Sequence, residues 1–93
     1  MITLEDIEAV LRDRLAELVE GSYSITLLTD TELVARKIME EAFELCLELG
    51  REHVDRRRIA AEAADLIFHA LAGLVGAGVP LSAVLTELGE RRR

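Results

Sequence analysis

Apolar residues recur every three or four positions over most of the chain, which is the spacing of amphipathic helices. The first segment with this pattern carries Leu4, Ile7, Leu11, Leu15 and Leu18 on one face. Thr3 and Asp6 resemble a capping box, with Asp in place of the usual Glu. We therefore expect a first helix that begins after Thr3 and ends near Gly21.

A loop and a long second helix are predicted next. Residues 21–29, which include Ser22, Tyr23 and Ser24, indicate the loop. Thr29 and Glu32 form a second capping-box pattern before a long amphipathic segment. The second helix is therefore expected over residues 30–49, and the glycine at position 50 ends it.

Two further helices complete the predicted fold. Asp55 suits the N-cap of a helix over residues 56–77, with Gly78 at its end. Pro80 opens a short fourth helix that frays into the arginines at 91–93. The prediction is an all-α, four-helix chain in a single domain over residues 1–93, with the two long helices antiparallel.

The helix over residues 56–77 is apolar almost all round, which is typical of a helix surrounded by other helices. The rest of so short a chain cannot surround it, so we expect a homodimer or larger homo-oligomer to complete the bundle. A monomer with a tightly packed, alanine-rich helix is the alternative. The most apolar stretch, from Ile59 to Val79, could span a bilayer by length, but Glu62, Asp65 and His69 would then be buried in lipid at great cost. We therefore expect no membrane partner.

Composition narrows the class further. A hydrophobic content of 51% with one proline excludes both a disordered chain and an all-β fold. The net charge of −7 excludes a general nucleic-acid backbone binder. The single cysteine, Cys46, cannot form an internal disulfide and is expected to be a buried thiol. The first residues lack the basic start of a signal peptide, which favours the cytoplasm.

Acidic residues form stripes on both long helices. On the helix over 30–49, one narrow stripe contains Lys37, Glu41, Glu44 and Glu48. On the helix over 56–77, the only polar stripe contains Arg58, Glu62, Asp65 and His69. Because both helices turn neighbouring faces toward the core, we expect the two acidic stripes to meet.

Such carboxylates need a compensating positive charge. A single E-x-x-E pair usually lies on a solvated helix surface, but Glu62 and Asp65 repel each other on an otherwise apolar helix. Four converging carboxylates describe an all-oxygen site for Mg²⁺ or Mn²⁺. Arginine side chains that pair with all four acids are the alternative. Zinc is disfavoured, since no Cys or His cluster has ligand spacing.

These motifs resemble a known family. The pattern E-E-x-x-E followed by E-x-x-D is similar to the MazG-like, all-α nucleotide pyrophosphohydrolases, and more closely to the phosphoribosyl-ATP pyrophosphohydrolases of histidine biosynthesis. The matching segments cover most of the chain: Gly21-Ser22-Tyr23-Ser24, Leu27-Leu28, Ala35-Arg36-Lys37-Ile38, Glu40-Glu41-Ala42 with Glu44, Glu62-Ala63-Ala64-Asp65-Leu66 with His69, and Gly78-Val79 with Leu81 and Val84.

The resemblance implies hydrolysis of the α–β phosphate link of 1-(5-phosphoribosyl)-ATP, which releases pyrophosphate and 1-(5-phosphoribosyl)-AMP. It implies Mg²⁺, or Mn²⁺ as the alternative, as the cofactor and a small nucleotide as the substrate. The implied metal ligands are Glu41, Glu44, Glu62 and Asp65. Glu41 or Glu44 is the expected general base for the attacking water. Glu40 and His69 are expected to support these ligands.

Other residues are candidates for holding the substrate phosphates. They are polar or basic residues near the start of the long helices: Ser22, Tyr23, Ser24, Lys37, Arg57 and Arg58. For Lys37, an ion pair with Glu41 one turn away is the alternative. For His69, a hydrogen bond to Asp65 is preferred over metal ligation. The arginines at 91–93 form a basic tail.

Three residues depart from the family pattern. Thr26 stands where a lysine is usual, Met39 where a glycine is usual, and Phe68 where a tyrosine is common. Thr26 removes a possible phosphate contact, and Met39 is expected to crowd the backbone near the acids. A general MazG-like hydrolase of nucleoside triphosphates is therefore the second hypothesis. A helical dimerisation module without enzyme activity is the third.

Overall fold

A computed structural model describes residues 1–17 and 22–91 of the chain, and all regular structure in these residues is helical. The helices are α1 (Leu4–Glu17), α2 (Tyr23–Thr29), α3 (Thr31–Leu49), α4 (Arg56–Gly76) and α5 (Leu81–Glu90). The predicted all-α class is confirmed. The predicted count of four helices is wrong, because α2 occupies most of the segment that was expected to be a loop.

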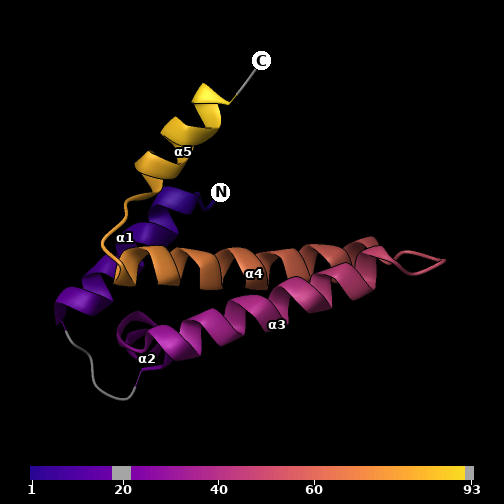
Figure 1. Cartoon of the computed structure of the whole chain (residues 1–93), viewed down its shortest axis with the longest axis horizontal. Coiled ribbons are helices and arrows are strands. Elements are labelled where there is room, and N and C mark those ends of the chain that lie inside the picture. Colours follow the sequence, from indigo (N-terminus) through magenta and orange to yellow (C-terminus); the bar gives the residue numbers. More distant parts are fainter. Residues whose placement is uncertain (18–21, 92–93) are drawn as a thin grey trace.

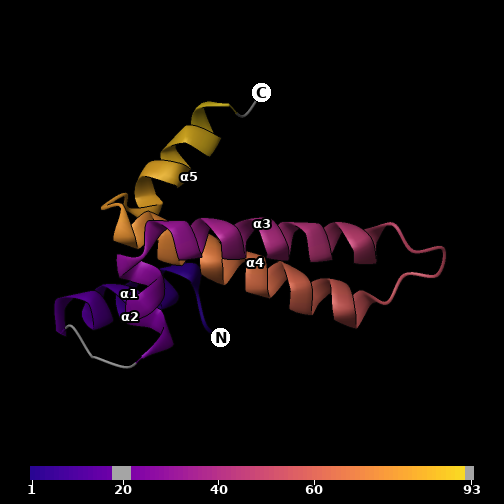
Figure 2. The same ribbon diagram turned by 60° about the horizontal axis from the view of Figure 1, so that its bottom comes forward.

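The two long helices form the body of the molecule. α3 and α4 pack along each other as an antiparallel hairpin, and α1 and α2 cover the end at which α4 finishes (Figures 1 and 2). α5 points away from this body and begins beside α1 (Figure 1). The predicted antiparallel pair of long helices is therefore present.

Side-chain caps fix two of the helix starts as predicted. The Thr3 backbone N–H donates to Asp6 at 2.9 Å, and the Asp6 N–H donates to the Thr3 hydroxyl at 3.1 Å. This is the reciprocal pattern of a capping box. At the start of α4, the Asp55 carboxylate accepts hydrogen bonds from the backbone N–H groups of Arg57 and Arg58. The predicted caps at Thr3 and Asp55 are confirmed.

The segment expected to be a loop is a short helix, because a side-chain cap stabilises its start and buried leucines anchor one of its faces. Ser22 caps α2 by accepting from the Ile25 backbone N–H at 3.1 Å. Leu27 and Leu28 on α2 are buried against the rest of the core. Thr29 is the last residue of α2 and does not cap α3, whose N-cap is Asp30. The expected end of the first helix near Gly21 lies outside the described residues.

The remaining helix ends agree closely with the expected ones. Gly50 is the C-cap of α3. α4 stops one residue earlier than predicted, with Ala77 as its C-cap. Gly78 has φ +75°, a conformation that glycine adopts easily, and it turns the chain toward Pro80, the N-cap of α5. Of the basic tail, positions 92 and 93 lie outside the described residues.

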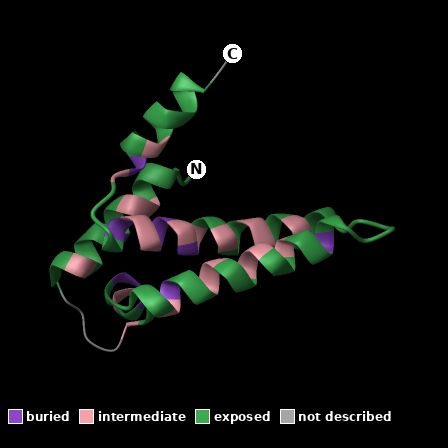
Figure 3. Cartoon of the chain, in the orientation of Figure 1, coloured by how far each residue is buried: buried purple, intermediate pink, exposed green. Residues whose placement is uncertain are grey.

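The buried core lies at the end of the hairpin that α1 and α2 cover (Figure 3). It consists of apolar residues from α1 to α5: Leu11, Leu27, Leu28, Val34, Leu71, Ala72, Val75 and Leu81. The other half of the hairpin is largely exposed or half-buried (Figure 3). α4 is long and apolar enough to cross a membrane by length and composition alone, a test that core helices of soluble proteins also pass.

Candidate metal centre

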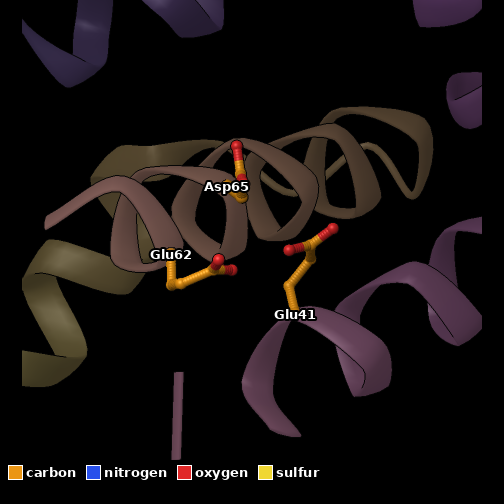
Figure 4. Close-up of side chains that lie close together, drawn as sticks. All are labelled: Glu41, Glu62 and Asp65. Carbon is orange, nitrogen blue, oxygen red and sulfur yellow. The ribbon is translucent and has the colours of Figure 1, made fainter. Parts of the chain in front are cut away.

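Three carboxylates from the two long helices converge in the middle of the hairpin. Glu41 on α3 and Glu62 and Asp65 on α4 each offer one oxygen, and these oxygens all lie within 4.8 Å of one another. Figure 4 shows Glu41 reaching from α3 toward the side chains of α4. The predicted meeting of the two acidic stripes is confirmed for these residues, which we call the carboxylate cluster.

Two oxygens of the cluster are buried without a partner. Glu41 Oε2 and Glu62 Oε2 accept no hydrogen bond from any described residue. Burial raises the pKa of Glu41 above its ordinary value of 4.5, and the charges of Glu44 and Asp65 raise it further. The pKa of Glu62 is also raised, by burial and then by Glu44. The fold therefore disfavours the ionised forms of both carboxyl groups. A bound cation would stabilise the ionised forms and so lower both pKa values.

Glu44 lies beside the cluster rather than within it. Its side chain is exposed, and it does not belong to the group of oxygens that share one small region. Burial is the largest cause of the raised pKa values of Glu41 and Glu62, and Glu44 is near enough to both groups to be the next largest. The fourth predicted acid is therefore adjacent to the other three.

Arginine does not neutralise the cluster in the part of the chain that the structure describes. The ion pairs there join Arg12 to Glu8, Lys37 to Glu40, Arg51 to Glu48 and Arg91 to Glu87. Lys37 thus pairs with Glu40 at 3.4 Å, not with Glu41 as the alternative interpretation expected. A three-residue spacing brings Glu40 as close to Lys37 along the helix surface as a four-residue spacing would bring Glu41.

Glu48 belongs to the same predicted stripe but is not part of the cluster. It is buried near the end of α3 and accepts two hydrogen bonds from the Arg51 guanidinium, at 3.0 and 3.2 Å. Of the arginines at the start of α4, Arg57 and Arg58 are exposed and lie one to two turns before Glu62. Their backbone N–H groups, rather than their side chains, bond to Asp55.

His69 connects the cluster to α2. Its Nδ1 lies 2.7 Å from the backbone carbonyl oxygen of Asp65, and its Nε2 lies 2.9 Å from the hydroxyl of Tyr23. The predicted hydrogen bond between His69 and Asp65 is therefore present, but it uses the main chain instead of the carboxylate. The contact with Tyr23 was not predicted, because residues 46 positions apart share no local sequence signal.

The other predicted residues are placed as follows. The hydroxyl of Ser22 caps α2, and Ser24 is half-buried in the first turn of that helix. Met39 is 67% exposed, so its side chain points to solvent and does not crowd the acids.

Cys46 is exposed, and the expectation of a buried thiol is wrong. It faces solvent because α3 buries only one side along the outer half of the hairpin (Figure 3).

The carboxylate cluster offers only oxygen atoms as ligands, and oxygen is the ligand type that Mg²⁺ and Mn²⁺ prefer. The sequence profile described as "Phosphoribosyl-ATP pyrophosphohydrolase" matches residues 4–92, which include every carboxylate described above. The chain belongs to this family. The phosphoribosyl-ATP pyrophosphohydrolase family is a family of enzymes, so the predicted resemblance and the enzyme class are both confirmed. The dimerisation module without activity is set aside.

Relatives of similar length carry the same name. The chain is 46% identical over 87 residues to a phosphoribosyl-ATP pyrophosphatase of Methanosphaerula palustris, covering 90% of this chain and 86% of that protein. It is 38% identical over 91 residues to one of Metallosphaera sedula, covering 97% and 96%. A histidine biosynthesis trifunctional protein of Kluyveromyces lactis is 41% identical over 88 residues, which are 95% of this chain but 10% of that protein.

Proposed function

We propose that this enzyme hydrolyses the α–β phosphate bond of 1-(5-phosphoribosyl)-ATP to 1-(5-phosphoribosyl)-AMP and pyrophosphate, the second step of histidine biosynthesis. Membership of the phosphoribosyl-ATP pyrophosphohydrolase family supports the substrate. The names of the relatives, which include a histidine biosynthesis protein, support the pathway. The observation that carries the chemistry is the carboxylate cluster with its two buried, unpartnered oxygens.

The residues of the cluster fit a divalent cation. Glu41, Glu62 and Asp65, with Glu44 beside them, would hold Mg²⁺, or Mn²⁺ as the alternative. The bound cation would supply positive charge that neutralises the substrate's polyphosphate. His69 is not a ligand in this proposal, because both of its ring nitrogens already have hydrogen-bond partners. It supports Asp65 instead, and Glu40 stands one residue before Glu41 in its ion pair with Lys37.

A carboxylate must take the proton of the attacking water. As the oxygen of water bonds to phosphorus, the anhydride P–O bond breaks, pyrophosphate leaves, and the proton passes to the base. Glu41 and Glu44 are the two candidates. The arrangement favours Glu44, because Glu41 belongs to the close group of three oxygens while Glu44 is adjacent, exposed and free to meet a water.

The substrate phosphates are proposed to meet the polar and basic residues around the cluster: Ser22, Ser24, Lys37, Arg57 and Arg58. Arg57 and Arg58 support this role because their exposed side chains precede Glu62 on α4 and form no ion pair with a described acid. The surface ion pair between Lys37 and Glu40 contributes little to stability, so Lys37 could give it up to bind a phosphate. The hydroxyl of Tyr23, the sixth candidate, is directed at His69 in this structure.

A second copy of the chain is proposed to complete the bundle. The residues Met39, Phe43 and Leu47, which we call the α3 stripe, recur every four residues on one face of α3 and are 67%, 63% and 52% exposed. Ile67 on α4 is also exposed. An apolar stripe of this length is characteristic of a helix–helix interface. We place the homodimer in the cytoplasm, with a nucleotide substrate and neither nucleic acid nor membrane as a partner.

The test is a pyrophosphate-release assay that compares 1-(5-phosphoribosyl)-ATP with ATP and the other common nucleoside triphosphates. We expect kcat/KM to be highest for 1-(5-phosphoribosyl)-ATP in Mg²⁺, and activity to disappear when a chelator removes the metal. A preference for plain triphosphates would contradict the proposed substrate and assign the chain to general MazG-like hydrolysis. Activity that persists in chelator would contradict the role of the cluster.

A further inference from the structure

Tyr23 and His69 join the start of α2 to the middle of α4 beside the carboxylate cluster. Tyr23 as a whole residue is 51% exposed, whereas His69 is 7% exposed. The two rings meet edge to face, with centroids 6.0 Å apart, and Phe68 packs against His69 in the same manner at 5.4 Å. The imidazole is thus held between two aromatic rings, with one nitrogen directed at each hydrogen-bond partner.

The two hydrogen bonds define which nitrogen carries the proton. A backbone carbonyl can only accept, so the 2.7 Å contact with Asp65 requires a hydrogen on Nδ1. In the neutral imidazole Nε2 is then an acceptor, and the Tyr23 hydroxyl must donate to it across 2.9 Å. The hydroxyl hydrogen of Tyr23 is therefore committed to His69 and is not available to a phosphate.

His69 lies next to cluster residues of both long helices. It is one turn from Asp65 on α4 and bonds to that residue's carbonyl oxygen. On the α3 side, burial is the main cause of the raised pKa of Glu41, and His69 is near enough to lower that pKa whenever its imidazole is protonated. An imidazole at this position could offer the carboxylates an N–H group if its ring turned away from the Tyr23 hydroxyl and the Asp65 carbonyl. Its orientation therefore matters to the cluster.

We propose that Tyr23 is a positioning residue that acts through His69. By donating to Nε2, it holds the imidazole as the Nδ1–H tautomer against the Asp65 carbonyl, so that no ring N–H competes for the carboxylate oxygens. This role rests on the proposed function, since it concerns oxygens that the metal and substrate use. It differs from a substrate contact, because the hydroxyl touches neither phosphate nor metal.

The tautomer of His69 tests the arrangement without substrate or metal. Tyr23→Phe keeps the ring and removes only the donor. Proton–nitrogen correlation spectra of the two imidazoles, recorded at about pH 8.5 where histidine is ordinarily neutral, distinguish the two tautomers. We expect the Nδ1–H form for His69 in the wild type and its partial or complete loss in Tyr23→Phe. His53, the other histidine, is exposed and serves as the internal control.

Kinetics separates positioning from substrate contact. In Tyr23→Phe we expect kcat for 1-(5-phosphoribosyl)-ATP to fall roughly two- to tenfold, the equivalent of one neutral hydrogen bond, with KM unchanged. Thr29→Ala, which removes a hydroxyl from the other end of α2, should change neither value. Thermal unfolding checks that both variants are folded.

The outcomes are distinct. An unchanged His69 tautomer in Tyr23→Phe overturns the proposal, and so does a raised KM with unchanged kcat. The samples used for the spectra contain neither substrate nor metal. The spectra therefore report the tautomer of His69 even if the wild type prefers another nucleotide. Failure of the proposed function would appear in the pyrophosphate assay of the wild type instead.

Discussion

A Cβ atom added to Gly76 would lie 2.6 Å from the carbonyl oxygen of Leu28, closer than such atoms approach in proteins. This glycine lets the end of α4 pack directly on the backbone of α2. The contact fixes α2 against the helix that carries Glu62 and Asp65, so it connects the packing of the core to the geometry of the site.

Gly76→Ala is expected to destabilise the fold by about 1–3 kcal/mol, since neither backbone can move without disturbing the core. Urea unfolding measures the change. Gly89→Ala is the matched control: it lies in α5 with open space around it, and the better helix propensity of alanine should raise stability by about 0.5–1 kcal/mol. Equal stability of Gly76→Ala and wild type would show that the close contact relaxes freely.

Glu44→Gln and Asp65→Asn are each expected to lower activity by at least about a hundredfold and leave the fold intact. Removing one of several repelling carboxylates should also raise the melting temperature in chelator and reduce the upward shift that Mg²⁺ produces. Thermal melts with and without Mg²⁺, beside the pyrophosphate assay, measure both effects. Glu90→Gln, the same chemical change in α5, is the control. Near-normal turnover in saturating Mg²⁺ would remove the residue from the metal centre.

The raised pKa of Glu41, caused first by burial, predicts a pH dependence of the metal-free fold. A group with a raised pKa in the folded state stabilises that state below its ordinary value of 4.5, and this stability is lost as the pH rises through the raised pKa. Glu41→Gln should therefore become more stable than the wild type as the pH increases. Urea unfolding in chelator at about pH 4 and about pH 8 measures the difference. A stability difference between Glu41→Gln and the wild type that does not change with pH would contradict this prediction. With excess Mg²⁺ at the higher pH, the wild type should instead be the more stable of the two.

Association through the α3 stripe predicts that the wild type shows no stable monomer at micromolar concentration in light scattering or sedimentation. Phe43→Glu places a charge in the centre of the stripe and should yield monomer. Leu88→Glu is the matched control, because Leu88 is also exposed, at 59%, but lies on α5. A folded wild-type monomer of 10.3 kDa would reject the dimer. Dissociation by Leu88→Glu alone would move the interface to α5.

Ser22 is both the N-cap of α2 and a proposed phosphate contact, and two substitutions separate these roles. Ser22→Ala should lose about 1 kcal/mol of stability with the cap, and roughly ten- to a hundredfold in kcat/KM with a hydrogen bond to a charged phosphate. Ser22→Asp retains a capping oxygen but adds a negative charge. It should keep the stability and lose activity. Normal activity of Ser22→Asp would show that the residue only caps the helix.

Local sequence was sufficient wherever a structural feature depends on neighbouring residues. The capping box at Thr3 and the N-cap residue Asp55 predicted the starts of α1 and α4, because caps join groups two or three residues apart. Gly50 predicted the end of α3, whereas the capping box expected at Thr29 did not form because Asp30 caps that helix. Helical spacing predicted that Glu41 would meet Glu62 and Asp65, because a stripe beside the apolar face of one long helix must lie near the corresponding stripe of its antiparallel neighbour.

Tertiary structure decided what depends on distant contacts. α2 is a helix although Ile25, Thr26 and Thr29 favour it little, because burial of Leu27 and Leu28 compensates for weak propensity. The exposure of Cys46 follows from how little of the outer hairpin a single chain covers. The bond between Tyr23 and His69 exists because α2 packs on α4, an arrangement that Gly76 permits. The sequence therefore determined which acids come together, while long-range packing decided that Tyr23 is linked to Asp65 through His69.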